Sequence, residues 1–247
     1  MSDRPDTPAA ARSSTVAIAI VCKTPDSGKS KTRLSPPLRP DECAAISAAF
    51  IDDLSSTMGL LAADGDVACY ALYTPVGSEA RLRRLIPDHF DLVAQRGDGF
   101  GDRLMFGIAD LLQRHAGAIL VNSDSPTLPR DLLRAAVDAV RSGDNVVLSP
   151  ADDGGYTLIG LSQLHTRLFD DMPWSTPAVH PLTVARAGEL GLPVVDVHGW
   201  YDVDDEASLR TLTDELAGRP PAFATLAGAP APATRRFLLN RDAALDG

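Results

Sequence analysis

The sequence predicts an α/β fold, namely a single three-layer αβα domain with a mostly parallel central sheet. Residues 15–22 (TVAIAIVC) form a continuous, β-branched apolar run, the pattern of a strand buried on both faces. Beyond it, short apolar runs alternate with longer segments whose apolar residues recur at helical spacing, which is typical of parallel strands joined by crossover helices. With 247 residues, 45% of them hydrophobic, the chain can fill the core of one such domain.

The elements follow in order over an expected catalytic domain at 15–217. The first helix is expected at 41–61, with Pro40 suited to its first turn. Gly143 should end a later helix, and Asp204 or Asp205 should cap the last one. The other expected strands are 67–73, 92–95, 118–122, 146–149, 156–161 and 194–197, and the other helices follow Ser78 and span 102–115, 129–142, 178–190 and 207–216.

The two ends of the chain are expected to lie outside this domain. Residues 1–14 are polar and should be disordered, and the Ala/Pro-rich tail at 218–247 should be extended or partly disordered. The first segment lacks the apolar centre of a signal peptide, and no apolar run approaches the roughly 20 residues of a membrane helix. We therefore expect a cytoplasmic protein.

Charge and cysteine content narrow the possible partners. A formal net charge of −10 excludes a general positive field, so neither nucleic acid nor a membrane surface is an expected partner. Cys22, Cys43 and Cys69 lie in apolar runs without CxxC spacing, which favours buried thiols over disulfides or a zinc site. A small phosphate ligand remains possible at a local cluster of cations.

Such a cluster follows the first strand, in the loop KTPDSGKSKTRL. Lys23, Lys31 and Arg33 with Gly28 lie at the carboxyl end of that strand, where open α/β sheets bind ligands and phosphates meet backbone N–H groups. The loop has neither the P-loop order nor a GxGxxG pattern. It is a candidate polyphosphate site, and a solvated basic loop is the alternative.

Carboxylates follow two other strands. Asp124 comes directly after the apolar run 118–121, and Asp202 and Asp204 would point the same way about Val203 in an extended segment. Mg²⁺ and Mn²⁺ prefer such oxygen ligands and bridge them to phosphates. The three aspartates are therefore candidate metal ligands, and turn or helix-capping roles are the alternative.

Two glycine-dense segments complete the candidates. In 150–156, the pair Gly154 and Gly155 permits close backbone approach to a ligand, and Asp153 is a candidate to deprotonate an acceptor; a hairpin turn is the alternative. The segment 95–103 offers Gly97, Gly99 and Gly101, which can wrap a flat base by backbone contacts, or serve as a flexible connection.

In series, KTPDSGKSKTRL, NSDSPTLP, DDGGYTLIGL, WST and YDVDDEASL resemble a bacterial glycosyltransferase-A-like family long catalogued as a domain of unknown function. Its members often carry an arsenosugar-biosynthesis-type glycosyltransferase label and are related in fold to the molybdenum-cofactor and phospholactate guanylyltransferases. The resemblance covers about residues 16–216. Two departures, Cys22-Lys23-Thr24 and Asn122-Ser123, bear on donor preference more than on the fold.

The resemblance implies a nucleotide-diphospho-sugar transferase fold and assigns roles to the candidate residues. It implies phosphate contacts from Lys23, Lys31 and Arg33, a nucleobase bordered by Gln95 and residues 97–101, and a metal held by Asp124 with Asp204 and Asp202. It implies an acceptor side made of Asp153, Gly154, Gly155, Tyr156, Trp174, Ser175 and Thr176.

The expected function is a Mg²⁺- or Mn²⁺-dependent transferase with a nucleotide-activated donor, with Asp124, Asp153 and Lys31 as catalytic candidates. A glycosyltransferase would move a sugar from a nucleotide sugar to a small acceptor. A nucleotidyltransferase would join an NTP to a phosphorylated small molecule and release pyrophosphate. The third alternative, a non-catalytic nucleotide-binding module, has less need for the proposed metal carboxylates.

Overall fold

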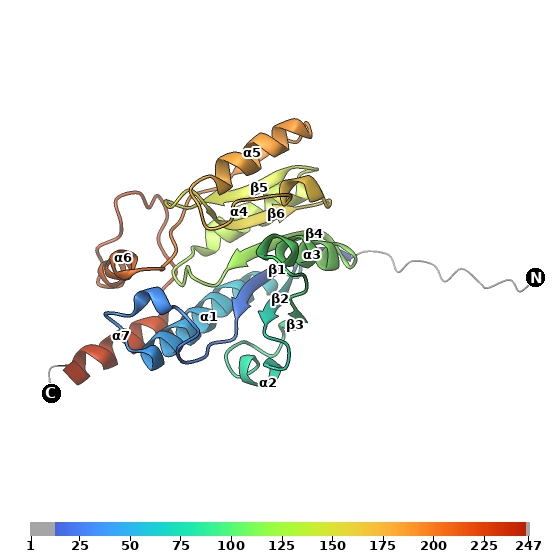
Figure 1. Ribbon diagram of the computed structural model, residues 1–247. Coiled ribbons are helices and arrows are strands. Elements are labelled where there is room, and N and C mark those ends of the chain that lie inside the picture. Colours follow the sequence, from blue (N-terminus) through green and yellow to red (C-terminus); the bar gives the residue numbers. More distant parts are fainter. Residues whose placement is uncertain (1–12, 246–247) are drawn as a thin grey trace, which may run out of the picture.

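A seven-stranded sheet forms the middle layer of the protein in the computed structural model, which describes residues 13–245 (Figure 1). The strand order is β3-β2-β1-β4-β6-β5-β7. β6 is antiparallel to both of its neighbours, whereas the other neighbouring strands pair in parallel, as expected for a mostly parallel sheet. The strands are β1 (Ser13–Lys23), β2 (Val67–Thr74), β3 (Asp91–Ala94), β4 (His115–Asn122), β5 (Val146–Pro150), β6 (Tyr156–Leu161) and β7 (Val194–Asp196).

Helices cover both faces of this sheet, which confirms the three-layer αβα architecture. One buried cluster joins the sheet to α1, α4, α6 and α7, and a second joins its other face to α3 and α5. The helices are α1 (Pro40–Ala62), α2 (Glu79–Leu82), α3 (Phe100–Leu112), α4 (Arg130–Arg141), α5 (Val179–Glu189), α6 (Glu206–Leu216) and α7 (Pro232–Leu245), with short 3₁₀ helices η1 (Thr32–Leu34) and η2 (Thr166–Leu168).

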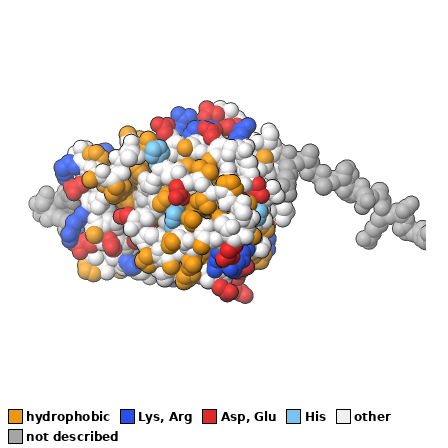
Figure 2. Space-filling view, turned by 90° about the horizontal axis from the view of Figure 1, so that it is seen from above, with side chains coloured by type: hydrophobic (Ala, Val, Ile, Leu, Met, Phe, Trp, Pro, Cys, Tyr) orange, Lys and Arg blue, Asp and Glu red, His pale blue; other side chains and the backbone are white. Residues whose placement is uncertain are grey.

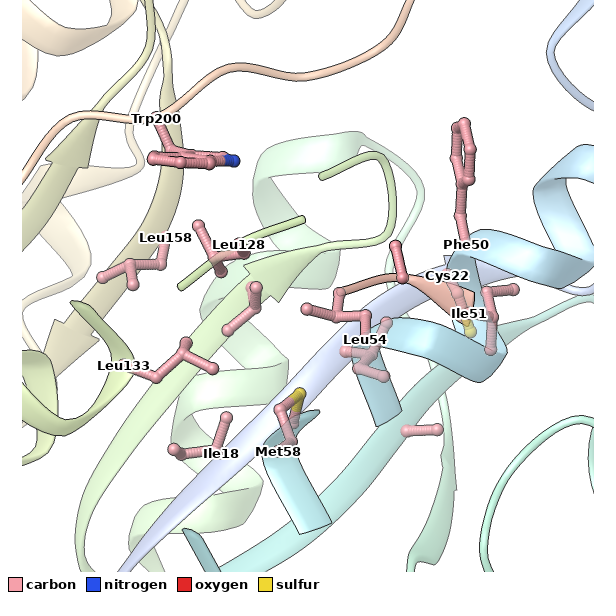
Figure 3. Packing of buried hydrophobic residues seen from close by; sticks show 14 of the residues in the cluster. Ile18, Cys22, Phe50, Ile51, Leu54, Met58, Leu128, Leu133, Leu158 and Trp200 are labelled. Atoms are coloured by element: carbon pink, nitrogen blue, oxygen red, sulfur yellow. The ribbon is translucent and has the colours of Figure 1, made fainter. Parts of the chain in front are cut away.

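Alternation along β1 explains how it holds both layers together. Val16, Ile18 and Ile20 belong to the α1 cluster, whereas Ala17 and Ala19 face the other layer. Figure 3 shows side chains of α1 lying over β1 near Ile18. Full burial of each large aliphatic side chain contributes roughly 1.5–3 kcal/mol, so this central strand anchors the loop that follows it.

The amino-terminal boundary and the start of β4 differ from expectation. Ser13 and Ser14 already belong to β1 instead of a disordered segment, and residues 1–12 lie outside the described part of the chain. His115 begins β4 and does not end α3, which stops at Leu112. The buried His115 ring hydrogen-bonds Thr15 and Tyr70 on the neighbouring part of the sheet, a contact that helical periodicity does not reveal.

The expectation of an extended tail is wrong for residues 232–245, which form α7. This helix packs beside α1 (Figure 1). The Asp53 carboxylate of α1 is 3% exposed and accepts hydrogen bonds from the backbone N–H groups of Ala233 and Thr234, at 2.8 and 2.7 Å. A buried acceptor 180 residues away thus satisfies the first turn of a helix whose first residues belong to the Ala/Pro-rich stretch 227–233.

Among the described helices, α1 is long and apolar enough to cross a membrane by length and composition, a test that a buried core helix also passes. Much of it is buried inside the protein, as in the core helix of a folded domain.

On the face in Figure 2, acidic and basic side chains lie next to one another. The three cysteines are buried and free, as expected.

Candidate active site

The candidate site lies at the carboxyl ends of β1 and β4. From β1 the chain moves outward to β2 and β3, and it then returns to pair β4 on the opposite side of β1. Open α/β sheets bind ligands at such a topological switch point, because the loops after the two strands diverge and leave a crevice. The basic loop follows β1 and Asp124 follows β4, so both predicted motifs reach this crevice.

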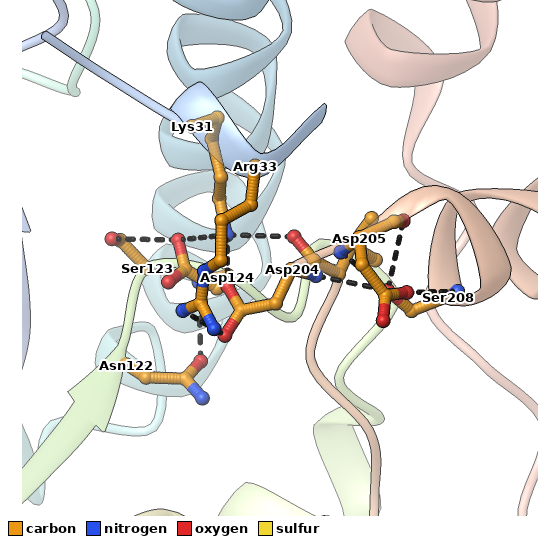
Figure 4. Close-up of polar contacts among 9 residues, drawn as sticks. Lys31, Arg33, Asn122, Ser123, Asp124, Asp204, Asp205 and Ser208 are labelled. Atoms are coloured by element: carbon orange, nitrogen blue, oxygen red, sulfur yellow. Dashed lines mark hydrogen bonds and ion pairs between the residues drawn. The ribbon is translucent and has the colours of Figure 1, made fainter. Parts of the chain in front are cut away.

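Lys31 connects the two predicted carboxylates. Its Nζ atom lies 2.8 Å from Asp124 Oδ1 and 2.9 Å from Asp204 Oδ1, and it donates to the Val203 carbonyl at 2.7 Å (Figure 4). The Lys31 backbone has a left-handed φ of 47°, an uncommon conformation for a residue with a side chain. Arg33 Nη2 donates to Asp204 Oδ2 at 2.9 Å from the exposed side.

Packing behind the acidic segment fixes Asp204 next to Asp124. Trp200 and Tyr201 are each 2% exposed, and the Val203 N–H donates to the Asp124 carbonyl at 2.9 Å. Val203 is fully buried, while Asp202 and Asp204 line the crevice, which agrees with the expected alternation.

Asp205, one of the two residues predicted to cap the last helix, performs that role. Its side chain accepts from the Ser208 N–H at the start of α6. Asp204 is therefore available to Lys31 and Arg33.

The charges of the crevice influence one another strongly. Burial opposes the charge on Lys31, but Asp124 and Asp204 outweigh this effect and raise the pKa of its ammonium group. For Asp202, burial and then the charges of Asp204, Asp153 and Asp124 raise the pKa to about 7. The crevice therefore concentrates negative charge that a cation would stabilise.

Asp124 after β4 and Asp204 before α6 suit a hard divalent cation. Asp124 and Asp204 direct carboxylate oxygens at one point, where the Lys31 ammonium provides the positive charge. Residues 13–245 contain no group of three His, Cys, Asp or Glu side chains placed to hold a metal, and the role of Asp202 as a ligand stays a prediction. Two carboxylates still fit Mg²⁺, which usually keeps several waters and shares phosphate oxygens.

Two adjoining cavities share these carboxylates. The first, here called the basic cavity, has a volume of about 310 Å³. Its lining residues are Lys23, Lys29, Ser30, Lys31, Thr32, Arg33, Ser47, Ser123, Asp124 and Asp204. The second, the aromatic cavity, has a volume of about 320 Å³ and also contacts Arg33, Ser123, Asp124 and Asp204.

Aromatic side chains shape the second cavity. Phe100 and Trp174 form an edge-to-face pair with ring centroids 5.3 Å apart, and Tyr156 also lines the cavity. Gly101 lies against the Trp174 ring, since a Cβ atom there would be 2.6 Å from Trp174 Nε1. The remaining predicted acceptor-side residues in the lining are Asp153, Gly155, Ser175 and Thr176.

Several predicted residues line neither cavity. Gln95 donates from Nε2 to the carbonyls of Cys22 and Leu72, so its amide connects β1 and β2. Gly154 occupies the β5–β6 hairpin turn, with a φ of 87°. Gly28, Gly97, Gly99 and Gly101 lie in loops or at the start of α3 and also line neither cavity.

Other lining residues were not predicted. Phe100 is half exposed within the Gly-rich segment, where an aromatic residue beside glycines was the available signal. Thr157, Val179 and Ser47 belong to regular elements whose sequence pattern indicates only packing.

Comparisons with known proteins agree with this architecture. Residues 57–176 match a family described as an uncharacterized protein conserved in bacteria (DUF2064). Comparison with curated proteins gave no significant match. Among solved structures, the chain is similar to a proposed nucleotide-diphospho-sugar transferase from Desulfovibrio desulfuricans G20, with a TM-score of 0.78, 24% identity, and coverage of 92% of this chain and 95% of that one.

Two ligand-bound structures share the fold at lower similarity. CMP:2-keto-3-deoxy-manno-octonic acid synthetase in complex with CTP has a TM-score of 0.55 at 13% identity, covering 83% of this chain and 99% of that one. Glucosyl-3-phosphoglycerate synthase from Mycobacterium tuberculosis, with Mn²⁺, UDP and glucosyl-3-phosphoglycerate, has a TM-score of 0.51 at 14% identity, covering 90% and 88%. The chain thus has the fold of nucleotide-diphospho-sugar transferases, as the motifs predict.

Proposed function

We propose that the protein is a metal-dependent transferase that moves a sugar from a nucleotide sugar to a small acceptor. One observation carries this proposal: a cation-lined cavity and an aromatic cavity adjoin at the Asp124 and Asp204 carboxylates. Folds of this kind place different chemistries on one scaffold, so the site and not the fold supports the choice. The buried free thiols suit the cytoplasmic location that we also propose.

The basic cavity supplies the groups that a nucleoside diphosphate needs. Lys23, Lys29 and Arg33 offer charge-assisted hydrogen bonds to phosphate oxygens at the end of β1. Lys31 is held by the carboxylates and would contact phosphate after exchanging partners. Mg²⁺ or Mn²⁺ held by Asp124 and Asp204 would supply charge neutralisation for the leaving group.

The aromatic cavity supplies an acceptor surface next to these groups. Asp153 is exposed at the β5–β6 turn, and its Oδ1 accepts from the Gly155 N–H at 2.8 Å. This hydrogen bond orients the carboxylate, and its other oxygen can accept the proton of an attacking hydroxyl. We therefore assign Asp153 the role of general base.

Nucleotidyl transfer is the second candidate, and the basic cavity is the observation in its favour. Three lysines and one arginine in its lining suit a departing pyrophosphate as well as a diphosphate. The CTP-bound synthetase of similar fold also belongs to that reaction class. The narrower arsenosugar-biosynthesis label stays a prediction.

A thermal-shift panel tests the proposal, because a ligand that binds the native state raises the melting temperature. Nucleoside triphosphates, nucleoside diphosphates and nucleotide sugars would each be added with and without Mg²⁺ or Mn²⁺. Metal-dependent stabilisation by one nucleotide sugar, followed by release of a nucleoside diphosphate in turnover, is the expected result. Preference for a triphosphate with pyrophosphate release would select nucleotidyl transfer, and no shift with any ligand would contradict both reactions.

A further inference from the structure

The two adjoining cavities carry opposite charge. Three lysines, one arginine and two aspartates line the basic cavity, a formal charge of +2. Four aspartates and one arginine line the aromatic cavity, a formal charge of −3 when all are ionised and still −2 when Asp202 is protonated. A polyanion is therefore attracted to one side of the shared carboxylates and repelled from the other.

A divalent cation would not reverse this difference. Asp124 and Asp204 are the carboxylates that would hold it, and both face the basic cavity as well. Asp153 and Asp202 line the aromatic cavity but not the basic cavity. Within residues 13–245, neither of them forms an ion pair with a Lys or Arg side chain. The single lining cation, Arg33, is already paired with Asp204.

The rest of the lining favours a ligand with an apolar face and hydrogen-bond donors. Phe100, Trp174 and Tyr156 present aromatic surface, and Leu104 and Val179 add aliphatic surface. Ionised carboxylates only accept hydrogen bonds, so they pair with hydroxyl or ammonium groups and not with phosphate or carboxylate groups. Carbohydrates and amino sugars combine such donors with an apolar C–H face.

We propose that the aromatic cavity binds a neutral or cationic, hydroxylated acceptor and discriminates against phosphorylated or carboxylated ones. This inference rests on the proposed function, because it places the donor phosphates in the basic cavity. It selects between the two reactions, since the alternative nucleotidyl transfer needs a phosphorylated acceptor. It also gives Asp153 and Asp202 a role in acceptor specificity.

The first experiment measures the potential of the aromatic cavity without any substrate. Trp174 and Trp200 are the two tryptophans of the sequence, and Trp200 is 2% exposed, so aqueous quenchers reach chiefly Trp174. Fluorescence quenching would be compared for caesium, iodide and neutral acrylamide, with Trp174→Phe as the baseline. Each ion's quenching constant would be divided by that of acrylamide. We expect this ratio to be several-fold higher for caesium than for iodide, and we expect Asp153→Asn to reduce the difference between the two ions. Equal or stronger quenching by iodide would overturn the proposal.

The second experiment compares glucose, glucosamine and glucose 6-phosphate as matched probes that share one ring. Trp174 fluorescence would be titrated with the protein saturated by Mg²⁺ and the nucleoside diphosphate that stabilises it most, so that the basic cavity is filled. We expect glucose and glucosamine to bind at least about ten-fold more tightly than glucose 6-phosphate. Asp153→Asn should reduce this affinity ratio. Asp88→Asn, an exposed change outside both linings, should leave this affinity ratio unchanged.

The outcomes separate this inference from the proposed function. Glucose 6-phosphate binding as tightly as glucose, or no response to glucose and glucosamine while a nucleotide still binds, would overturn the acceptor class and leave nucleotide-dependent transfer standing. Failure of every nucleotide to stabilise the protein would instead contradict the proposed function, and the quenching experiment would still test the charge of the cavity.

Discussion

Lys31 Nζ lies between Asp124 and Asp204, the two carboxylates that we propose as metal ligands. Its side chain is only 7% exposed, whereas the two carboxylates are about one-third exposed. An ammonium group can enter or leave such a position by rotating a flexible side chain. We infer that metal entry and release of Lys31 toward phosphate are linked.

Replacement of Lys31 by Met should therefore have opposite effects without and with metal. Without metal, the two carboxylates lose their shared cation, and the free energy of unfolding should fall by about 1–3 kcal/mol. With Mn²⁺, the metal meets no competing ammonium, so the melting temperature of K31M should rise more than that of the wild type. Differential scanning calorimetry across a Mn²⁺ series measures both effects.

Lys29→Met is the matched control for this prediction. Lys29 belongs to the same loop but is 66% exposed and pairs only with Asp26 in the described ion pairs. Its loss should change stability by no more than about 0.5 kcal/mol and leave the Mn²⁺ response unaltered. Identical Mn²⁺ responses of K31M and the wild type would show that Lys31 does not compete with metal at this position.

Asp124→Asn tests the carboxylate itself. The substitution keeps the shape of the side chain and leaves Asp204 to pair with Lys31, so we expect little change in melting temperature. Turnover should fall by roughly 100-fold or more, because metal-assisted charge stabilisation is lost. Asp88→Asn, an exposed change between α2 and β3, should retain full turnover in the same assay. Normal turnover of D124N would remove Asp124 from the mechanism.

At the scale of elements, one buried carboxylate of α1 satisfies the first turn of α7. Asp53→Ala removes the acceptor of the Ala233 and Thr234 N–H groups, so the free energy of unfolding should fall by about 2–4 kcal/mol. Asp52→Ala, one residue away and more exposed, should cost less than about 0.5 kcal/mol. Urea unfolding measures the difference, and equal losses for the two variants would contradict a specific contact.

The same contact shows what the sequence could and could not predict. The apolar run of β1 and the periodicity of α1 are local signals, and both elements were predicted within a few residues. For α7, by contrast, residues 234–245 (TRRFLLNRDAAL) are rich in helix-favouring Arg, Leu and Ala, a local signal that the expectation of an extended tail missed. Nothing in the sequence indicates the contact of this helix with Asp53, 180 residues away. Similarly, His115 joins β4 because of its hydrogen bonds to Thr15 and Tyr70.

Some residues of the candidate site could likewise be predicted from the sequence, and others could not. Asp124 and the basic loop could be predicted because each directly follows a strand, and strand ends meet at one edge of a parallel sheet. The pairing of Lys31 with Asp204 spans 173 residues and could not be read from local pattern. Gln95 was predicted near a nucleobase, yet its amide hydrogen-bonds two backbone carbonyls, because side-chain direction depends on neighbouring strands.

At the scale of the whole molecule, the candidate site and the buried His115 lie at opposite ends of β4. Asp124 follows the carboxyl end of β4, whereas His115 begins that strand. The His115 ring is 7% exposed, with Nδ1 2.7 Å from Thr15 Oγ1 and Nε2 2.8 Å from Tyr70 Oη. Chemistry at one end of β4 can therefore be separated experimentally from stability determined at the other.

The pH dependence of the free energy of unfolding would separate the contribution of His115 to stability from the chemistry of the site. Burial, followed by the charge of Arg114, lowers the pKa of His115, and Asp91 opposes this only in part. At about pH 7.5, one unit above the ordinary pKa of about 6.5, His115 is mostly neutral in the folded and unfolded states alike, and the protonation of the two states differs only below that pH. As the pH falls below that value, the unfolded chain gains a proton that the folded protein resists, so stability is lost until the folded-state pKa is passed.

His115→Gln keeps hydrogen-bonding capacity but cannot titrate. Between about pH 7.5 and about pH 5.5, urea unfolding should show a larger loss of stability for the wild type than for this variant. Nucleotide-induced thermal shifts at about pH 7.5 should be equal in the two proteins, because His115 is neutral there and lines neither cavity. Equal pH dependence of stability would mean that other groups, with the many carboxylates first among them, account for the acid sensitivity of the domain.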